Sequence, residues 1–335
     1  MNRIRIISPG MLSTIQDRGR MGYQQYGVTV SGATDKYSFQ LANILVGNNR
    51  YEGCIEMTMH GATVEFMHKT AFAVTGADML PTLNGKSIRA NETVIAEAGD
   101  ILKSGTAISG LRSYLALAGG FDVENVMGSK STYLRGSFGG FKGRKLKSGD
   151  ELSITSSSFD QIRMIPSDMV PVYRNDSVLS VIMGTEEEYF TVDSIETFLN
   201  STYTITEQSD RMGIRLDGQP ITHKASADIL SSGITEGTIQ VPKNGKPIIM
   251  MADRQTTGGY TRIASVISTD IPKLAQMKPG NTVRFQKISL QDAHDRIRVQ
   301  EERILQMIGV FENQKRYFRV SINGEVFEVE IQDTL

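Results

Sequence analysis

Residues 27–32 read GVTVSG, and the same form, G-[VI]-x-[VL]-x-G, returns at residues 213–218 as GIRLDG. Three further pairs follow in the same order: ANIL at 42–45 with ADIL at 227–230, EGCIE at 52–56 with EGTIQ at 236–240, and AGD at 98–100 with PGN at 279–281. The offset between the two series drifts only from 186 to 181 residues. Four ordered matches at nearly one offset predict two related domains, with a ligand site between them.

Short β-branched runs separated by Gly, Asn and Asp predict that both domains are mainly β, in closed or sandwiched sheets. These runs are residues 70–75, 93–96, 178–183, 237–241, 247–251, 282–285 and 319–322, and the alternating residues 1–9 read as a further strand. The Asn-Gly pairs at 84–85, 244–245 and 323–324 are hairpin signals, because both residues tolerate positive φ.

Helices are expected in three places only. Asp35 is placed to cap a helix that ends before Gly47, and Thr185 with Glu188 forms a capping-box pattern that predicts a helix over 186–199. Residues 289–308 show helical spacing of apolar side chains among charged ones. We therefore expect a first β domain over residues 1–165, a second over 166–288, and a C-terminal amphipathic helix and β-hairpin over 289–335.

Composition excludes several classes of protein. The chain has 335 residues and a formal net charge of -1, so it has no general attraction to nucleic acid or anionic membranes. One cysteine, Cys54, excludes an internal disulfide, and no apolar run is long enough to span a bilayer. These features predict a cytoplasmic protein.

The common catalytic and metal motifs are missing from the sequence. The four histidines, His60, His68, His223 and His294, lack metal-ligand spacing, so no metal site is expected. Lys86 and Ser87 follow Gly85, but the Walker pattern requires glycine where Leu80 stands. If the protein uses ATP, another subunit is expected to bind it.

Polar residues gather beside glycines in several segments, most densely at residues 252–260. After an apolar strand this segment offers Asp253, Arg254, Gln255, Thr256 and Thr257, followed by two glycines. Such a loop can bind a planar amide or carboxylate, and it can equally be a polar turn whose Asp and Arg brace the backbone.

Two acidic–basic pairs show the same ambiguity. Asp17 with Arg18, and Asp210 with Arg211, can line a ligand site or brace turns. The glycine-rich residues 136–144 carry Lys142 and Arg144, so this segment can close over an anion.

At these segments the chain resembles the biotin-dependent carboxyltransferase (allophanate-hydrolase-2-like) family. The matching residues are 14–20, 31–35, 42–48, 128–133, 210–213, 239–242 and 253–260, and the resemblance runs from about residue 8 to residue 287. It implies a cyclophilin-like β-barrel fold in each of the two domains.

The family resemblance also implies an activity and partners. Members include the C component of ATP-hydrolysing 5-oxoprolinase, also known as KipA. It acts with the A and B components of that enzyme (the latter KipI-like) to convert 5-oxo-L-proline to L-glutamate. The resemblance supports the location of a site at these segments, and the chemistry of the side chains there makes Asp253, Arg254 and Gln255 the expected catalytic residues. The expected substrate-binding residues are Asp17, Arg18, Asp210, Arg211, Thr256 and Thr257.

Two other functions remain open within the same family. One is carboxylation of urea or a related small amide, with carboxybiotin delivered in trans, because this chain has no biotin-attachment lysine in the usual setting. The other is a KipA-like regulatory protein that binds and antagonises a KipI-like kinase inhibitor. No cofactor is expected to bind this chain itself.

Overall fold

The computed structural model of the chain describes residues 2–155, 159–312, 316–322 and 325–331, the last two ranges by their backbone only. The chain divides into two compact units, residues 1–289 and 290–335. The domain boundaries predicted at residues 165 and 288 stay predictions. Within the larger unit, residues 2–155 are here called the first half and residues 176–287 the second half.

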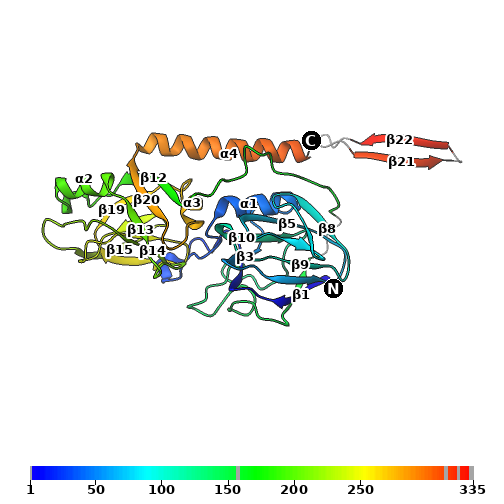
Figure 1. The fold of residues 1–335 in the computed structure, drawn as a ribbon, viewed down its shortest axis with the longest axis horizontal. Coiled ribbons are helices and arrows are strands. Elements are labelled where there is room, and N and C mark those ends of the chain that lie inside the picture. Colours follow the sequence, from blue (N-terminus) through cyan, green and yellow to red (C-terminus); the bar gives the residue numbers. More distant parts are fainter. Residues whose placement is uncertain (1, 156–158, 313–315, 323–324, 332–335) are drawn as a thin grey trace. The chain divides into compact units, whose positions relative to one another are not determined.

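The first half consists of two sheets (Figure 1), and their buried apolar side chains form one hydrophobic core. Their strand orders are β11-β1-β4-β9-β6-β7 and β2-β3-β10-β5-β8. Buried Ile4 of β1 and Ile55 of β3 belong to the same apolar cluster, so each sheet covers the other's inner face. The strands are β1 (Asn2–Ser8), β2 (Leu12–Gln16), β3 (Cys54–Thr58), β4 (Thr63–Phe66), β5 (Thr70–Asp78), β6 (Thr82–Leu83), β7 (Lys86–Ser87), β8 (Thr93–Ala96), β9 (Ile101–Lys103), β10 (Ser109–Leu117) and β11 (Glu151–Ile154).

The second half is a closed barrel of seven strands in the order β12-β19-β16-β17-β14-β13-β20. Parallel pairing of β12 with β20 closes the ladder, and Phe198, Tyr203 and Phe285 pack inside the same core. The predicted mainly-β fold is therefore confirmed. The barrel strands are β12 (Asp176–Met183), β13 (Tyr203–Ile205), β14 (Gly213–Asp217), β16 (Thr238–Gln240), β17 (Ile248–Met250), β19 (Arg262–Val266) and β20 (Thr282–Lys287), with β15 (Asp228–Gly233) and β18 (Thr257–Tyr260) forming a separate ribbon.

Two of the three predicted helices form where the sequence signals place them. Helix α1 (Lys36–Leu45) begins at Asp35, whose carboxylate accepts hydrogen bonds from the amides of Tyr37 and Ser38. Helix α4 (Leu290–Glu312) extends four residues beyond its predicted end. It is followed by the hairpin of β21 (Arg316–Ile322) and β22 (Glu325–Ile331). The Asn323-Gly324 signal lies outside the described residues.

The predicted start of the middle helix was wrong. Residues 187–189 form a 3-10 turn, η2 (Glu187–Tyr189), and Thr185 donates its hydroxyl hydrogen to Glu186. The chain then carries Phe190 into the core, and α2 (Val192–Asn200) begins only at Thr191, whose side chain accepts from the Ser194 amide. Burial of Phe190 therefore outweighed the local capping pattern. The remaining short elements are η1 (Gln24–Tyr26) and α3 (Ile271–Ala275).

The repeat read from the sequence is only partly visible in the secondary structure. EGCIE and EGTIQ both lead into strands, β3 and β16, and the glycines at 99 and 280 both occupy turns before a strand. GVTVSG at 27–32 has no regular structure, whereas 213–217 is strand β14, and ANIL lies in α1 whereas ADIL enters β15. The two halves therefore share some strands of the repeat and differ in the loops and helix between them.

The hairpin signal at Asn84-Gly85 is confirmed. Asn84 and Gly85 both have positive φ, 52° and 78°, and they join β6 to β7. Across the described residues no helix is long and apolar enough to cross a membrane.

The two threonines near α2 provide a matched test of its start. Thr191→Ala removes the side-chain acceptor at the helix N-terminus and should lower the free energy of unfolding by about 1 kcal/mol. Thr185→Ala, at an exposed position, should change it by less than about 0.5 kcal/mol. Urea denaturation measures both, and equal losses would contradict the observed cap.

Candidate functional site

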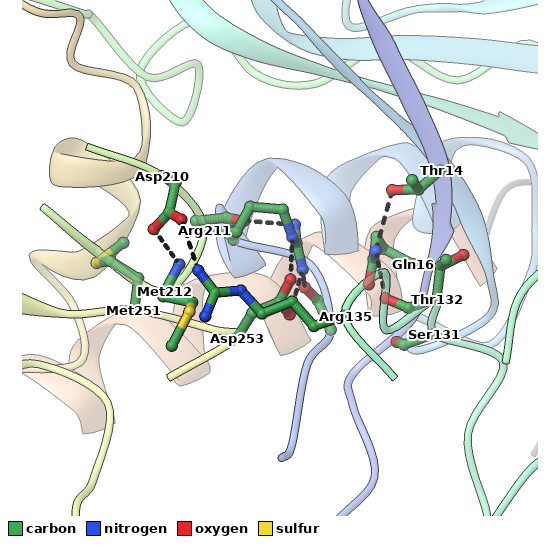
Figure 2. Close-up of polar contacts among 12 residues, drawn as sticks. Thr14, Gln16, Ser131, Thr132, Arg135, Asp210, Arg211, Met212, Met251 and Asp253 are labelled. Atoms are coloured by element: carbon green, nitrogen blue, oxygen red, sulfur yellow. Dashed lines mark hydrogen bonds and ion pairs between the residues drawn. The ribbon is translucent and has the colours of Figure 1, made fainter. Parts of the chain in front are cut away.

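One buried arginine, Arg211, bridges the two halves with its side chain. All five N–H groups of the Arg211 guanidinium donate hydrogen bonds. Nε and Nη2 donate to the two carboxylate oxygens of Asp253, at 2.9 and 3.1 Å. Nη2 also donates to the Gly32 carbonyl at 2.7 Å, and Nη1 donates to Glu56 and to the Thr34 hydroxyl. The contacts to Gly32, Thr34 and Glu56 cross between the halves. We call these five residues the Arg211 network (Figure 2 shows the Arg211–Asp253 contact).

Electrostatics keep Glu56 and Arg211 ionised. Burial alone would raise the pKa of Glu56, but the charges of Arg211 and Arg112 and hydrogen bonds from the Thr34 amide and the Tyr114 hydroxyl lower it below its usual value. Burial likewise opposes the charge on Arg211, yet Asp253 and Glu56 raise the pKa of its guanidinium. Removing one charge would therefore leave another buried without its partner.

A second set of polar contacts runs alongside this network. The Gln276 side chain of the second half accepts from the amides of Leu111 and Arg112 at 2.8 and 2.9 Å and donates to buried Asp35 at 2.7 Å. The Arg112 guanidinium donates in return to the Ala275 carbonyl. The junction between the halves is consequently polar, hydrogen-bonded and buried.

Asp17 braces a turn of the first half. Its carboxylate accepts from the Ser129 hydroxyl at 2.7 Å, from the Lys130 amide at 2.6 Å and from the Ser131 hydroxyl. The Asp17 carbonyl accepts from the Ala33 amide at 2.8 Å, one residue from Gly32 of the Arg211 network. Asp17, Arg211 and Asp253, three of the predicted site residues, thus make interior contacts beside this junction.

Arg254 also points inward. Its guanidinium donates to the carbonyls of Ile234 and Met251 at 3.3 and 3.2 Å, and its own carbonyl accepts from the Thr29 hydroxyl. Burial lowers the pKa of this guanidinium despite the nearby charges of Glu236 and Asp253. The geometry gives Arg254 a role in holding the 251–257 loop.

A cavity of about 810 Å³ opens on the second half beside the junction. Strands β14 and β17 form part of its wall, and Asp210 and Gln255 among the predicted site residues line it. Arg135 is the one lining residue that comes from the first half, and its guanidinium lies 3.7 Å from the Asp210 carboxylate. Figure 2 shows Arg135 extending to Asp210. The backbone bond from the Asp253 amide to the Arg211 carbonyl, 2.8 Å, brings the Asp210 and Gln255 segments to the same end of this cavity.

The other predicted site residues lie outside the cavity. Arg18 is exposed and lies over the Tyr51 ring at 5.8 Å. The Thr256 carbonyl accepts from the Ile234 amide, and exposed Thr257 begins strand β18. Cys54 is buried, and burial raises the pKa of its thiol well above the usual value, as expected for an unreactive thiol.

Comparison with known proteins identifies the family. The profile described as "Carboxyltransferase domain, subdomain A and B" matches residues 26–287. The chain belongs to the carboxyltransferase domain family. The C component of the 5-oxoprolinase of Escherichia coli (strain K12) is 39% identical over 290 residues, which cover 87% of this chain and 93% of that protein.

Longer members of the carboxyltransferase domain family are also similar. Urea amidolyase of Saccharomyces cerevisiae is 33% identical over 310 residues, 87% of this chain but 17% of that protein. The crystal structure of Kluyveromyces lactis urea amidolyase superposes with a TM-score of 0.86 at 30% identity, over 91% of this chain and 20% of that one. The fold described above is therefore that of a carboxyltransferase domain.

Sequence reasoning missed two residues of this carboxyltransferase domain that its geometry singles out. Glu56 stands out in the sequence only as part of the repeat, although a carboxylate between Ile55 and Met57 in an apolar strand signals a buried partner. Arg135 stands in an irregular loop, where no periodicity marks it. Local sequence does not show which segments a loop contacts, or which face of a strand is buried against the other half.

The acid dependence of stability tests the charge on Glu56. Since its folded pKa lies below the unfolded value of about 4.3, its stabilisation is complete above that pH and is lost as pH falls through the folded pKa. Wild-type protein should thus lose unfolding free energy more steeply below about pH 5 than Glu56→Gln does. Urea denaturation across pH measures this, and parallel curves would contradict the assignment.

Proposed function

We propose that this chain is the C component of an ATP-hydrolysing 5-oxoprolinase, which acts with the A and B components to open 5-oxo-L-proline to L-glutamate. One observation carries the proposal: 39% identity to the C component of a 5-oxoprolinase along 93% of that protein's length. Such coverage leaves little of the relative unmatched.

The chemistry sets what this chain has to supply. An amide carbonyl is a poor electrophile and its nitrogen a poor nucleophile, so donors must stabilise charge on oxygen while a base handles the N–H proton. In the cavity, Gln255 offers an exposed carboxamide and Arg135 an exposed cation, whereas the carboxylate of Asp253 is occupied by Arg211. We therefore assign substrate binding to the cavity. The catalytic role predicted for Asp253 remains a prediction.

The proposal places ATP on another subunit. The sequence carries no Walker pattern at the one Gly-Lys-Ser segment, residues 85–87, where Gly85 lies in the β6–β7 turn and Lys86 and Ser87 form strand β7. Biotin is not needed by this reaction, and no step is assigned to it. What this chain contributes is binding and orientation of the amide.

A carboxyltransferase acting on urea is supported less well. The urea amidolyases and the putative urea carboxylase are 30% to 34% identical, and this chain spans only 17% to 24% of their length. Most of the length of those proteins therefore has no counterpart in this chain.

Reconstitution tests the proposed function. The three purified components together should hydrolyse ATP in a 5-oxo-L-proline-dependent manner and release glutamate, and omission of this chain should abolish glutamate release. Coupled ADP and glutamate assays measure both products. Full turnover without this chain would contradict the proposal and would favour a regulatory role in binding the KipI-like component.

A further inference from the structure

Arg135 is presented to the cavity by a short, well-braced loop. The Tyr133 amide donates to the Phe138 carbonyl at 3.0 Å, and the two rings pack edge to face at 5.6 Å. A Cβ at Gly136 would lie 2.5 Å from the Tyr133 ring, so only glycine fits there. Phe138 in turn packs against the guanidinium of buried Arg20 at 4.8 Å. This bracing holds the loop that carries Arg135 at the mouth of the cavity.

The contact that Arg135 makes with Asp210 is weak. The pair is long, 3.7 Å, and the two side chains are 63% and 55% exposed. Exposed pairs of this kind contribute roughly 0 to 1 kcal/mol. Asp210 has a separate task, because its other oxygen accepts from the Met212 and Gly213 amides. A ligand anion can therefore engage Arg135 at little cost to the fold.

The other cations of the cavity lie farther from the junction. Arg215 lies on β14 opposite Ile248 of β17. It follows Arg211 by four residues, so the two arginines are about 13 Å apart along an extended strand. Lys246 is paired with Asp217 at 2.6 Å. Arg135 is thus the lining cation beside Asp210. Gln255, whose segment the Asp253–Arg211 backbone bond ties to that of Asp210, lines the same cavity with an exposed side chain, and its carboxamide makes no hydrogen bond within residues 2–155 and 159–312.

We propose that Arg135 binds the carboxylate of a small anionic cyclic amide while Gln255 pairs with its amide group, so that Arg135 determines specificity for carboxylate-bearing substrates. A lactam ring holds its amide cis, with N–H and C=O on the same side, and a glutamine carboxamide offers the complementary acceptor and donor. A guanidinium supplies the donors that suit a carboxylate. This inference rests on the proposed function, because it names how that substrate would be held.

Two ligands and matched variants test the proposal in the reconstituted complex. Arg135→Gln should raise the KM for 5-oxo-L-proline roughly 10- to 100-fold, the range for losing a charge-assisted hydrogen bond. It should leave unchanged the inhibition constant of 2-pyrrolidinone, the same lactam without a carboxylate. Arg89→Gln, a change at another exposed arginine outside the cavity, should leave both constants unchanged.

A change at Asp210 separates ligand binding from a structural role. Asp210→Asn keeps an oxygen for the 212 and 213 amides but removes the charge that competes for Arg135, so the KM for 5-oxo-L-proline should fall or stay the same. A rise in KM as large as that of Arg135→Gln would overturn the proposal, because the intramolecular pair would then be what matters.

The remaining outcomes are also decisive. An unchanged KM in Arg135→Gln, or an equal weakening of 5-oxo-L-proline and 2-pyrrolidinone, would overturn the assignment of Arg135. A larger rise in KM from Arg215→Gln than from Arg135→Gln would do so too. Failure of the wild-type complex to turn over 5-oxo-L-proline would instead contradict the proposed function itself.

Discussion

Burial of the Arg211 guanidinium constrains the rest of this structure. A desolvated cation is costly unless it is hydrogen-bonded and paired with opposite charge. Arg211 meets both conditions with groups from the two halves, Asp253 on one side and Glu56 with Gly32 and Thr34 on the other. The first half therefore cannot shift relative to the second without exposing or stranding a charge. Segments 31–35, 210–213 and 251–254 are fixed by the same requirement.

The position of the cavity follows from this constraint. Because Asp210 and Gln255 lie within two residues of Arg211 and Asp253 in the chain, the network that holds the junction also sets the spacing of the residues lining the cavity's end. The first half then adds Arg135 from its own braced loop. A binding site that takes residues from both halves is only as well defined as the junction between them. We infer that the buried charges serve function by positioning, and that the exposed groups beside them contact the ligand.

Local sequence predicted the secondary-structure elements of this fold better than the tertiary contacts between them. Strand periodicity and the Asp35 cap are local signals, and β5, β8, β12, β20 and α1 formed where those signals lie. The predicted start of the middle helix was wrong because burial of Phe190, a tertiary effect, outweighed the capping pattern at Thr185. The loop clusters were found from composition, but the sequence could not say which polar groups face inward. Arg254 points into the interior because its guanidinium donates to the carbonyl of Ile234, 20 positions away in the chain. Arg135 lines the cavity because its loop in the first half lies beside the second half, which its local sequence does not show.

A double-mutant cycle between Arg211 and Glu56 tests the central claim most directly. Urea unfolding at neutral pH of the wild type, Arg211→Gln, Glu56→Gln and the double variant would give a coupling energy, which should be about 1.5 to 3 kcal/mol if this buried pair joins the halves. The exposed pair Lys69–Glu97, with 67% and 62% of its side chains accessible, provides the reference and should give less than about 1 kcal/mol. A coupling energy for Arg211 and Glu56 no greater than that of the surface pair would contradict the account.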